Sequence, residues 1–442
     1  MGEVSRICKR TVVSTKPVEA GKYHPLSVLD RHMEKNHIRM VFYYYHTWPD
    51  KELGKITGKL RESLSEALNS FPVLTGRLIT DHDKGHWKIK CNDAGVRVIE
   101  AKAKGSLHRW LKNVNREKEL QLVYWEDMYY KPYFWSTFYV QLTEFEEGGL
   151  AIGLSCTHML ADPTSATSFV KAWADISLGL NMTSPPFFQP LSVRRPGNQN
   201  PYTDLIGHYS SSIQKPTSVK GTTRYTTITL GFSHQMVAAC MAMAQSTGAP
   251  SPSPFGALAG LFWVCLSKIK SKGPNDGLVG LSVCLDVRKA LNLDRGFFGN
   301  CMIYNKVPAI AGDLGDTRLA QAATAIREAE EKMERERIAD LIEWFENNDI
   351  NNPTMMNGHD LICASLETED PYSAVFENGF NPIRVSYYVE PVAGEGQVVI
   401  FPWKAAEDIL GRVAMVTVAE DEASELCKDD LLLNLSPTIL MK

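Results

Sequence analysis

Hydrophobic side chains recur early in the chain with the period of an amphipathic helix. Over residues 51–68 the apolar positions return every three or four residues, a spacing that predicts a helix with one buried stripe. This stripe consists of Leu53, Ile56, Leu60, Leu64 and Leu68. Asp50 is the predicted N-cap, and Pro72 marks the end of the helical segment.

The next segments are shorter and have the pattern of strands. We predict strands over residues 86–90, 96–100, 137–145 and 150–156. The turn at residues 146–149, Glu-Glu-Gly-Gly, joins the last two as an antiparallel hairpin. The last strand, LAIGLSC, is apolar on both faces, so we place it in the middle of a sheet.

A sharply bounded helix is predicted directly after this strand. Asp162 precedes Pro163, which is the order of an N-cap carboxylate followed by proline in the first turn. The buried face of the helix consists of Phe169, Trp173 and Ile176.

The second half alternates strands and helices after a polar stretch over residues 210–223. We interpret that stretch as a linker between an N-terminal domain, residues 1–209, and a C-terminal domain, residues 224–442. The predicted strands are 225–230, 278–285, 396–401 and 413–418, and the predicted helices are 234–245, 254–267 and a long charged one from Asp316 toward Trp344.

Length and charge limit the classes of function. A chain of 442 residues predicts two or three domains, and 44% hydrophobic with 22% charged residues is ordinary for a globular protein. The formal net charge is −4 and no basic stripe stands out, so nucleic acid is not an expected partner.

Cysteine usage and hydropathy predict a cytoplasmic protein. The nine cysteines are scattered and never form a CxxC pair, which argues against a disulfide framework and against a zinc site. We therefore expect no metal. The first residues lack the apolar core of a secretory signal, and no apolar run reaches the roughly 20 residues that span a bilayer.

His158 and Asp162 form the sharpest chemical motif. They lie between a predicted buried strand and a predicted capped helix, a junction at which a side chain can face an interior channel. An imidazole titrating near neutral pH can accept a proton from an alcohol or amine as it attacks a thioester. An H-x-x-x-D pattern also arises by chance, and the alternative is a core histidine beside an N-cap.

Five segments, in order, resemble the motifs of the BAHD acyltransferase family of plants. They are PLSVLD (residues 25–30), LRESLSEALNSFPVLTGRL (60–78), LSCTHMLADPTSATSFVKAWA (154–174), LAGLFWVC (258–265) and LDVRKAL followed by FFGN (285–300). The resemblance extends over essentially the whole chain.

This resemblance implies an α/β fold of two similar chloramphenicol-acetyltransferase-like domains, each a mixed sheet with flanking helices. It places an active-site channel at the domain interface, with acyl-CoA as co-substrate and no bound cofactor. His158 matches the family's general base, which acts without a covalent acyl-enzyme. Asp162 matches a structural aspartate, and the family implies a monomer.

One family motif is altered. The family has DFGWG before a strand that reads approximately P-x-R-V-S, whereas this chain has FENGF (residues 376–380) before PIRVS (382–386). In the family, the aspartate of DFGWG pairs with an arginine that Arg288 matches and supports a loop near the CoA channel. Glu377 is a shifted candidate for that partner.

Three features resemble the Eceriferum/Glossy-type and brassinosteroid-acylating branches of the family. They are the altered DFGWG motif, KCNDAGVRVIEA (residues 90–101) and the ending GQVVIFP (396–402) with RVAMVTVAED (412–421). Two hypotheses follow. In the first, the protein acylates a hydroxyl of a small lipophilic acceptor, such as a brassinosteroid-type sterol. In the second, it is a non-catalytic partner of a fatty-acid elongase at the endoplasmic reticulum, in very-long-chain wax synthesis.

Further candidates each have a structural alternative. Lys268 and Lys270 could contact the phosphates of CoA or lie on a solvated loop. Ser253 and Asn300 could reach the CoA channel by family analogy, or start a helix and form a turn. Cys156 fits a packed core thiol better than a nucleophile. The aromatic residues Tyr124, Trp125, Tyr129, Tyr130, Tyr133, Phe134 and Trp135 fit a core or the wall of an apolar acceptor pocket.

Overall fold

The computed structural model divides the chain into two compact units with interleaved sequences. The first unit comprises Met1–Ser192, Leu293–Asn300 and Pro371–Pro391, and the second comprises Val193–Asn292, Cys301–Asp370 and Val392–Lys442. The structure describes all residues except 1–2, 20, 46–53, 82–84, 190, 192, 194–201, 215–223, 247, 249, 271–277, 309, 311–316, 349–359, 393 and 405–407.

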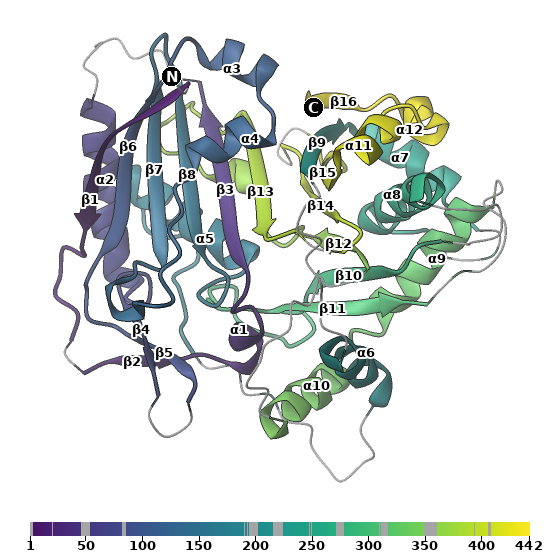
Figure 1. Cartoon of the computed structure of the whole chain (residues 1–442), viewed down its shortest axis with the longest axis horizontal. Helices are drawn as coiled ribbons and strands as arrows, with labels where there is room; N and C mark the ends of the chain where they lie inside the picture. The colour runs from purple at the N-terminus through teal and green to yellow at the C-terminus, as the bar shows by residue number, and fades with distance from the viewer. Residues whose placement is uncertain are drawn as a thin grey trace. The chain divides into compact units, whose positions relative to one another are not determined.

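A mixed six-stranded sheet is the centre of the first unit (Figure 1). Its strands, in spatial order, are β1 (Val4–Val12), β6 (Val96–Ala103), β7 (Phe138–Phe145), β8 (Leu150–Thr157), β3 (His37–Tyr44) and β13 (Arg384–Glu390). Only β6 and β7 pair in parallel; the other neighbours are antiparallel. A small sheet is formed by β2 (Tyr23–Pro25), β5 (Trp87–Lys90) and β4 (Arg77–Thr80).

Strand β8 is buried along its entire length, as its continuous apolar sequence predicts. On one side, Phe169 of α5 (Pro163–Ser177) packs edge to face on Phe138 of the neighbouring strand β7, with ring centroids 5.0 Å apart. On the other side, the backbone around Leu122 lies directly over Gly153, where a Cβ atom would stand 2.0 Å from the Leu122 carbonyl oxygen. Gly153 therefore permits the close approach that covers the strand.

The remaining helices of the first unit are short apart from α2 (Lys55–Ala67), which packs against α5. They are α1 (Val28–His32), α3 (Leu107–Asn113) and α4 (Arg116–Glu119), with 3₁₀ turns at Leu68–Ser70, Leu120–Leu122, Pro132–Phe134 and Pro371–Ser373.

Strand β13 comes from late in the sequence, and a buried charge cluster ties it to the first unit. The carboxylate of Glu119 is fully buried and accepts hydrogen bonds from Tyr43 (2.8 Å), Arg384 (3.0 Å) and Ser386 (3.1 Å), and also from the Tyr388 hydroxyl. A buried carboxylate with one cationic partner and several hydroxyl donors has the compensation that a buried charge needs.

The second unit contains a mixed seven-stranded sheet. Its order is β11 (Met302–Val307), β10 (Leu281–Asp286), β12 (Leu361–Ser365), β14 (Gln397–Pro402), β15 (Arg412–Ala419), β9 (Tyr225–Phe232) and β16 (Thr438–Met441). Its central helix, α8 (Pro254–Lys270), is buried from Phe255 to Ser267 and packs against α9. The other helices are α6 (Thr203–Gln214), α7 (His234–Met243), α9 (Arg318–Glu331), α10 (Arg335–Asn347), α11 (Glu420–Leu426) and α12 (Asp430–Leu435).

Several predicted boundaries differ from the structure. The long helix expected from Asp316 to Trp344 is two helices, α9 and α10, and Asp316 itself lies outside the described residues. Helix α2 begins after Gly54, whose φ of 93° is left-handed, and not after Asp50, which is also outside them. No glycine or proline marks the break between α9 and α10, so hydrophobic period alone could not locate it.

The predicted division into residues 1–209, 210–223 and 224–442 also differs from the interleaved units. Helix α6 occupies the start of the predicted linker, to residue 214, and residues 215–223 lie outside the described part of the chain. The first unit includes two segments from later in the chain, so no single boundary in the sequence can separate the two units.

We expect Gly153→Ala to destabilise the protein because the new methyl group would collide with the Leu122 carbonyl oxygen. Overpacking of this kind costs about 1–3 kcal/mol, so the midpoint of thermal or urea unfolding should fall. Gly58→Ala in α2 is the matched control, since its Cβ would meet only the tip of Arg61 at 3.9 Å and Ala favours a helix over Gly by about 1 kcal/mol. Equal midpoints for both variants would contradict this packing.

Candidate active site

His158 lies immediately after β8, at the junction that its sequence context predicts. Its backbone N–H donates to the carbonyl oxygen of Asn36 at 2.9 Å, which extends the pairing of β8 with β3 by one residue. The side chain is only 2% exposed. The imidazole is therefore held in the interior of the first unit.

The side chain of Asn300 determines which imidazole nitrogen bears the proton. The two amide protons of Asn300 are used by Asp30 Oδ1 (2.8 Å) and the His158 carbonyl oxygen (2.7 Å), so its Oδ1 faces His158 Nδ1 at 2.8 Å. An amide oxygen only accepts, and the hydrogen in this contact must come from Nδ1. In the neutral ring, Nε2 then has the free lone pair.

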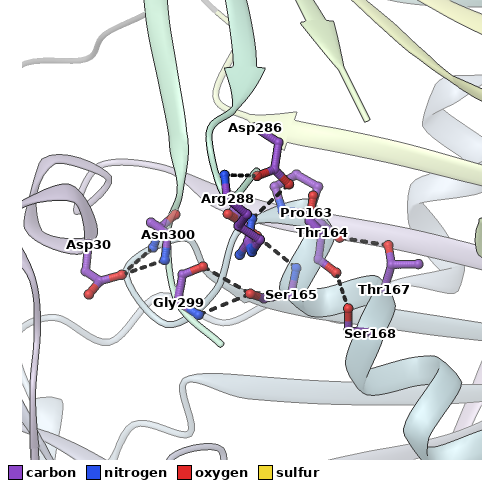
Figure 2. A network of polar contacts seen from close by, with 11 residues as sticks. Asp30, Pro163, Thr164, Ser165, Thr167, Ser168, Asp286, Arg288, Gly299 and Asn300 are labelled. Atoms are coloured by element: carbon purple, nitrogen blue, oxygen red, sulfur yellow. Dashed lines mark hydrogen bonds and ion pairs between the residues drawn. The ribbon is translucent and has the colours of Figure 1, made fainter. Parts of the chain in front are cut away.

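Asp30 holds Asn300 in this orientation. Its Oδ1 accepts from both the backbone N–H (2.9 Å) and the side-chain amide of Asn300, as Figure 2 shows. Its Oδ2 accepts from the backbone N–H of Ser27 at 2.7 Å, and the Ser27 hydroxyl caps Asp30 N in return, a capping box at the start of α1. One carboxylate thus orders both α1 and the partner of His158.

Burial lowers the pKa of His158 below its ordinary value, because the charged imidazolium loses hydration. The negative charge of Asp162, a backbone hydrogen bond, the hydrogen bond to Asn300 and the charge of Asp30 oppose this effect without reversing it. The imidazole is therefore neutral at neutral pH, the form that a general base requires.

Asp162 caps α5, as predicted. It is fully buried, and its Oδ1 accepts from Ser165 N at 2.8 Å. The Ser165 hydroxyl in turn donates to the Gly299 carbonyl oxygen (3.0 Å) and accepts from the Gly299 N–H (3.1 Å), which Figure 2 also shows. The start of α5 thereby fixes the residue next to Asn300.

A layer of aromatic side chains lies close to the end of β8. Tyr129 contacts the hydroxyl of Thr157 (3.4 Å) and donates to the Glu34 carbonyl oxygen, while Trp125 stacks on His37 with ring centroids 4.7 Å apart. Trp135 is fully buried. Tyr130, Tyr133 and Phe134 are instead largely exposed, so the predicted aromatic cluster divides into a packed part and a surface part.

Of the predicted CoA contacts, Asn300 belongs to the first unit, whereas Ser253, Lys268 and Lys270 belong to the second. Within the second unit, Lys270 forms ion pairs with Glu395 (3.1 Å) and Glu422, and Lys268 approaches Asp429 at 3.5 Å. Ser253 caps α8 through Gly256 N at 2.9 Å and contacts Glu330 at 3.4 Å.

Arg288, the predicted structural support, pairs with Asp286 in the second unit at 2.9 Å (Figure 2). Glu377, its suggested shifted partner, is exposed in the loop that replaces DFGWG.

Cys156 is a core thiol whose pKa is raised by burial, which opposes thiolate formation. In the part of the chain that the structure describes, no group of three or more His, Cys, Asp and Glu side chains could hold a metal ion. None of the described helices combines the length and the hydropathy needed to cross a membrane.

Sequence reasoning missed the link from Asp30 through Asn300 to His158. Asp30 lies in the PLSVLD motif and Asn300 in FFGN. The spacing of Ser27 and Asp30 already has the form of a capping box. The contact joins residues 270 positions apart, and only the folded chain shows it.

A family model described as Transferase family matches residues 3–430 of this chain. The protein ECERIFERUM 26-like of Arabidopsis thaliana is 25% identical over 426 residues, 94% of this chain and 92% of that protein. Shikimate O-hydroxycinnamoyltransferase of Nicotiana tabacum is 26% identical over 75% of this chain and 77% of its own length.

Two solved structures share the fold. Vinorine synthase matches with a TM-score of 0.71 at 20% identity, covering 99% of this chain and 100% of its own. Fusarium sporotrichioides TRI101, solved with coenzyme A and T-2, matches with a TM-score of 0.76 at 14% identity, covering 95% of this chain and 100% of its own. The predicted α/β class, with mixed sheets and flanking helices, is confirmed.

Replacing Asp162 with Asn should lower the pKa of His158 further. The amide keeps a carbonyl oxygen for Ser165 N but removes the negative charge that raises the imidazole pKa. NMR titration of the imidazole resonances, assigned with a His158→Gln variant, measures the shift. Glu146→Gln, in the β7–β8 turn, is the charge-matched control, and a higher His158 pKa in Asp162→Asn would contradict this electrostatic assignment.

Proposed function

Because the chain belongs to the Transferase family of BAHD acyltransferases, which use acyl-CoA as co-substrate, we propose that it transfers the acyl group to a hydroxyl of a small lipophilic acceptor with His158 as general base. The family assignment confirms the predicted resemblance and the acyl-CoA-dependent acyltransferase activity. The acceptor and the site residues are our proposal.

The observation that supports the role of His158 is the contact between its Nδ1–H and Asn300 Oδ1 at 2.8 Å. It leaves the Nε2 lone pair as the proton acceptor of a neutral, buried ring. In this role Asn300 orients the base, which is a different function from the CoA contact predicted for it from sequence.

The proposed reaction needs one proton acceptor and one direct displacement. Nε2 of His158 takes the proton of the acceptor hydroxyl as its oxygen attacks the thioester carbonyl carbon. The tetrahedral intermediate collapses with cleavage of the carbon–sulfur bond, and the imidazolium returns the proton to the CoA thiolate. Oδ1 of the Asn300 side chain stabilises the transient imidazolium by accepting from Nδ1–H.

We retain Ser253, Lys268 and Lys270 as proposed contacts of CoA. The two lysines differ in the carboxylates that already contact them. A phosphate at Lys270 would compete with two carboxylates, Glu395 and Glu422, whereas Lys268 has one carboxylate at 3.5 Å. Lys268 is therefore the better candidate of the two. Arg288 and Asp162 are proposed as structural support.

The proposed acceptor is a brassinosteroid-type sterol or a similarly lipophilic alcohol. This proposal is based on the subfamily resemblance of the altered DFGWG segment, residues 90–101 and the ending at residues 396–421. A hydroxyl acceptor agrees with the name of the tobacco relative, shikimate O-hydroxycinnamoyltransferase. We place this reaction in the cytoplasm, with the surface of the endoplasmic reticulum as the alternative.

A second candidate function is supported by the Arabidopsis relatives named ECERIFERUM 26 and ECERIFERUM 26-like, which match 95% and 94% of this chain. In it, the protein is a non-catalytic partner of a fatty-acid elongase in wax synthesis. The intact arrangement of His158, Asn300 and Asp30 favours catalysis over this alternative.

His158→Ala should abolish most acyl transfer, because removal of a general base costs on the order of 10²–10⁴-fold in rate. Release of free thiol from a panel of acyl-CoAs, with sterol and other hydroxyl acceptors, measures the loss. His108→Ala is the matched control, since His108 is an exposed histidine of α3 in the same unit.

Two outcomes distinguish the candidate functions. Turnover by wild type and His108→Ala, with loss in His158→Ala, supports catalysis through His158. Absence of thiol release from every protein, together with rescue of wax chain length in cells by His158→Ala and co-purification with an elongase, would replace it with the partner function.

A further inference from the structure

A groove of about 730 Å³ lies on the first unit, away from His158. It is formed by one face of α2, the C-terminal end of α5 and residues 376–380, the segment that replaces DFGWG. His158, Asn300 and Asp30 are not among its lining residues. The groove is therefore a feature separate from the candidate active site.

The floor of the groove is apolar and firmly held. What we call the floor is the apolar part of the lining, and it includes Ile56, Leu60, Ile176, Phe376 and Phe380. The Phe376 ring packs edge to face on Trp173 (4.7 Å between centroids), and its carbonyl oxygen accepts from the Ser177 hydroxyl at 3.3 Å. Phe376 and Phe380 nevertheless remain only partly buried, so apolar surface is available to a partner.

The charged residues that line the groove, here called its rim, are mainly acidic. Among the described residues that line the groove, the carboxylates are those of Glu62, Glu66 and Glu377 and the one ammonium group is that of Lys59, a formal charge of −2. Helix α5, 15 residues long, ends at the groove and adds the partial negative charge of a helix C-terminus. A cationic occupant is favoured, and an anionic membrane surface is disfavoured.

The spacing of the carboxylates favours an extended occupant over a compact one. Glu62 and Glu66 are exposed and four residues apart on α2, so they form a row of about 6 Å along the helix axis. Cationic side chains one turn apart on a facing segment match such a row. The apolar floor beside it matches the opposite side of the same segment.

We propose that this groove docks a basic amphipathic segment of a partner protein. The Lys or Arg side chains of that segment lie against Glu62, Glu66 and Glu377. Its large apolar side chains lie on Phe376, Phe380 and Ile176. Docking can be tested independently of the proposed acyl transfer through Glu62 and Glu66, neither of which belongs to the candidate active site.

Fluorescence anisotropy with labelled 18-residue peptides tests the proposal at about 0.15 M salt, where the screening length is about 8 Å. We expect an amphipathic Leu/Lys peptide to bind wild-type protein. A Leu/Glu peptide of the same pattern tests the charge, and a Ser/Lys peptide tests the apolar floor. Both should bind at least about tenfold more weakly, a difference of about 1.4 kcal/mol.

Charge reversal at the rim, Glu62→Lys with Glu66→Lys, should weaken Leu/Lys binding by at least tenfold, again about 1.4 kcal/mol, and leave acyl transfer unchanged. The control, Glu343→Lys with Glu346→Lys, makes the same change of net charge on exposed positions of α10. Phe380→Ala should also weaken binding.

The proposal is overturned if the α10 control weakens binding as much as the rim variant, since attraction is then non-specific. It is also overturned if the Ser/Lys peptide binds as tightly as Leu/Lys, or if wild type binds none of the peptides. In hydrogen exchange, the Leu/Lys peptide should protect the backbone amides of α2 and residues 374–380. Protection confined to other segments would contradict the proposed site.

Discussion

The hydrogen bond from His158 Nδ1 to Asn300 Oδ1 is the interaction on which the proposed chemistry depends. A buried imidazole has two possible neutral tautomers, and the one with the free lone pair on Nε2 needs an acceptor at Nδ1. Asn300 can be that acceptor because both of its amide protons are committed elsewhere. Asp30 fixes this commitment, and α1 fixes Asp30 through the capping box with Ser27. The tautomer of the base thus depends on a helix start more than a hundred residues earlier in the sequence.

The first unit is completed by two segments from later in the chain, and each is secured by buried polar contacts. Residues 293–300 are held by Asp30 and by the paired hydrogen bonds between Ser165 and Gly299. Strand β13 is held by the Glu119 carboxylate. Buried polar groups of this kind must be satisfied together, so their loss costs more than a solvent-exposed contact would. These buried contacts explain why both segments pack with the first unit. They also explain why the observed units differ from a division at one linker.

Local pattern was sufficient for much of the fold and for part of the site. The β7–β8 hairpin, the burial of β8 and the Asp162 cap before Pro163 are confirmed, because each is determined by neighbours in sequence. Hydrophobic period did not locate the break between α9 and α10 or the start of α2 at Gly54. The ion pairs of Lys270 and the hydrogen bond that orients Asn300 each join residues more than a hundred positions apart. Secondary-structure propensity and motif spacing contain no information on such contacts. The family motifs contain Asp30, His158 and Asn300, and only the structure shows the contacts between them.

The most direct test of the proposed base is the tautomer of His158 in the resting protein. Nitrogen-15 NMR of protein labelled at histidine distinguishes a protonated from an unprotonated ring nitrogen, and a His158→Gln variant identifies the resonances. The account predicts a neutral ring at neutral pH with the proton on Nδ1 and the lone pair on Nε2. A ring protonated on Nε2, with its lone pair directed at Asn300, would contradict it.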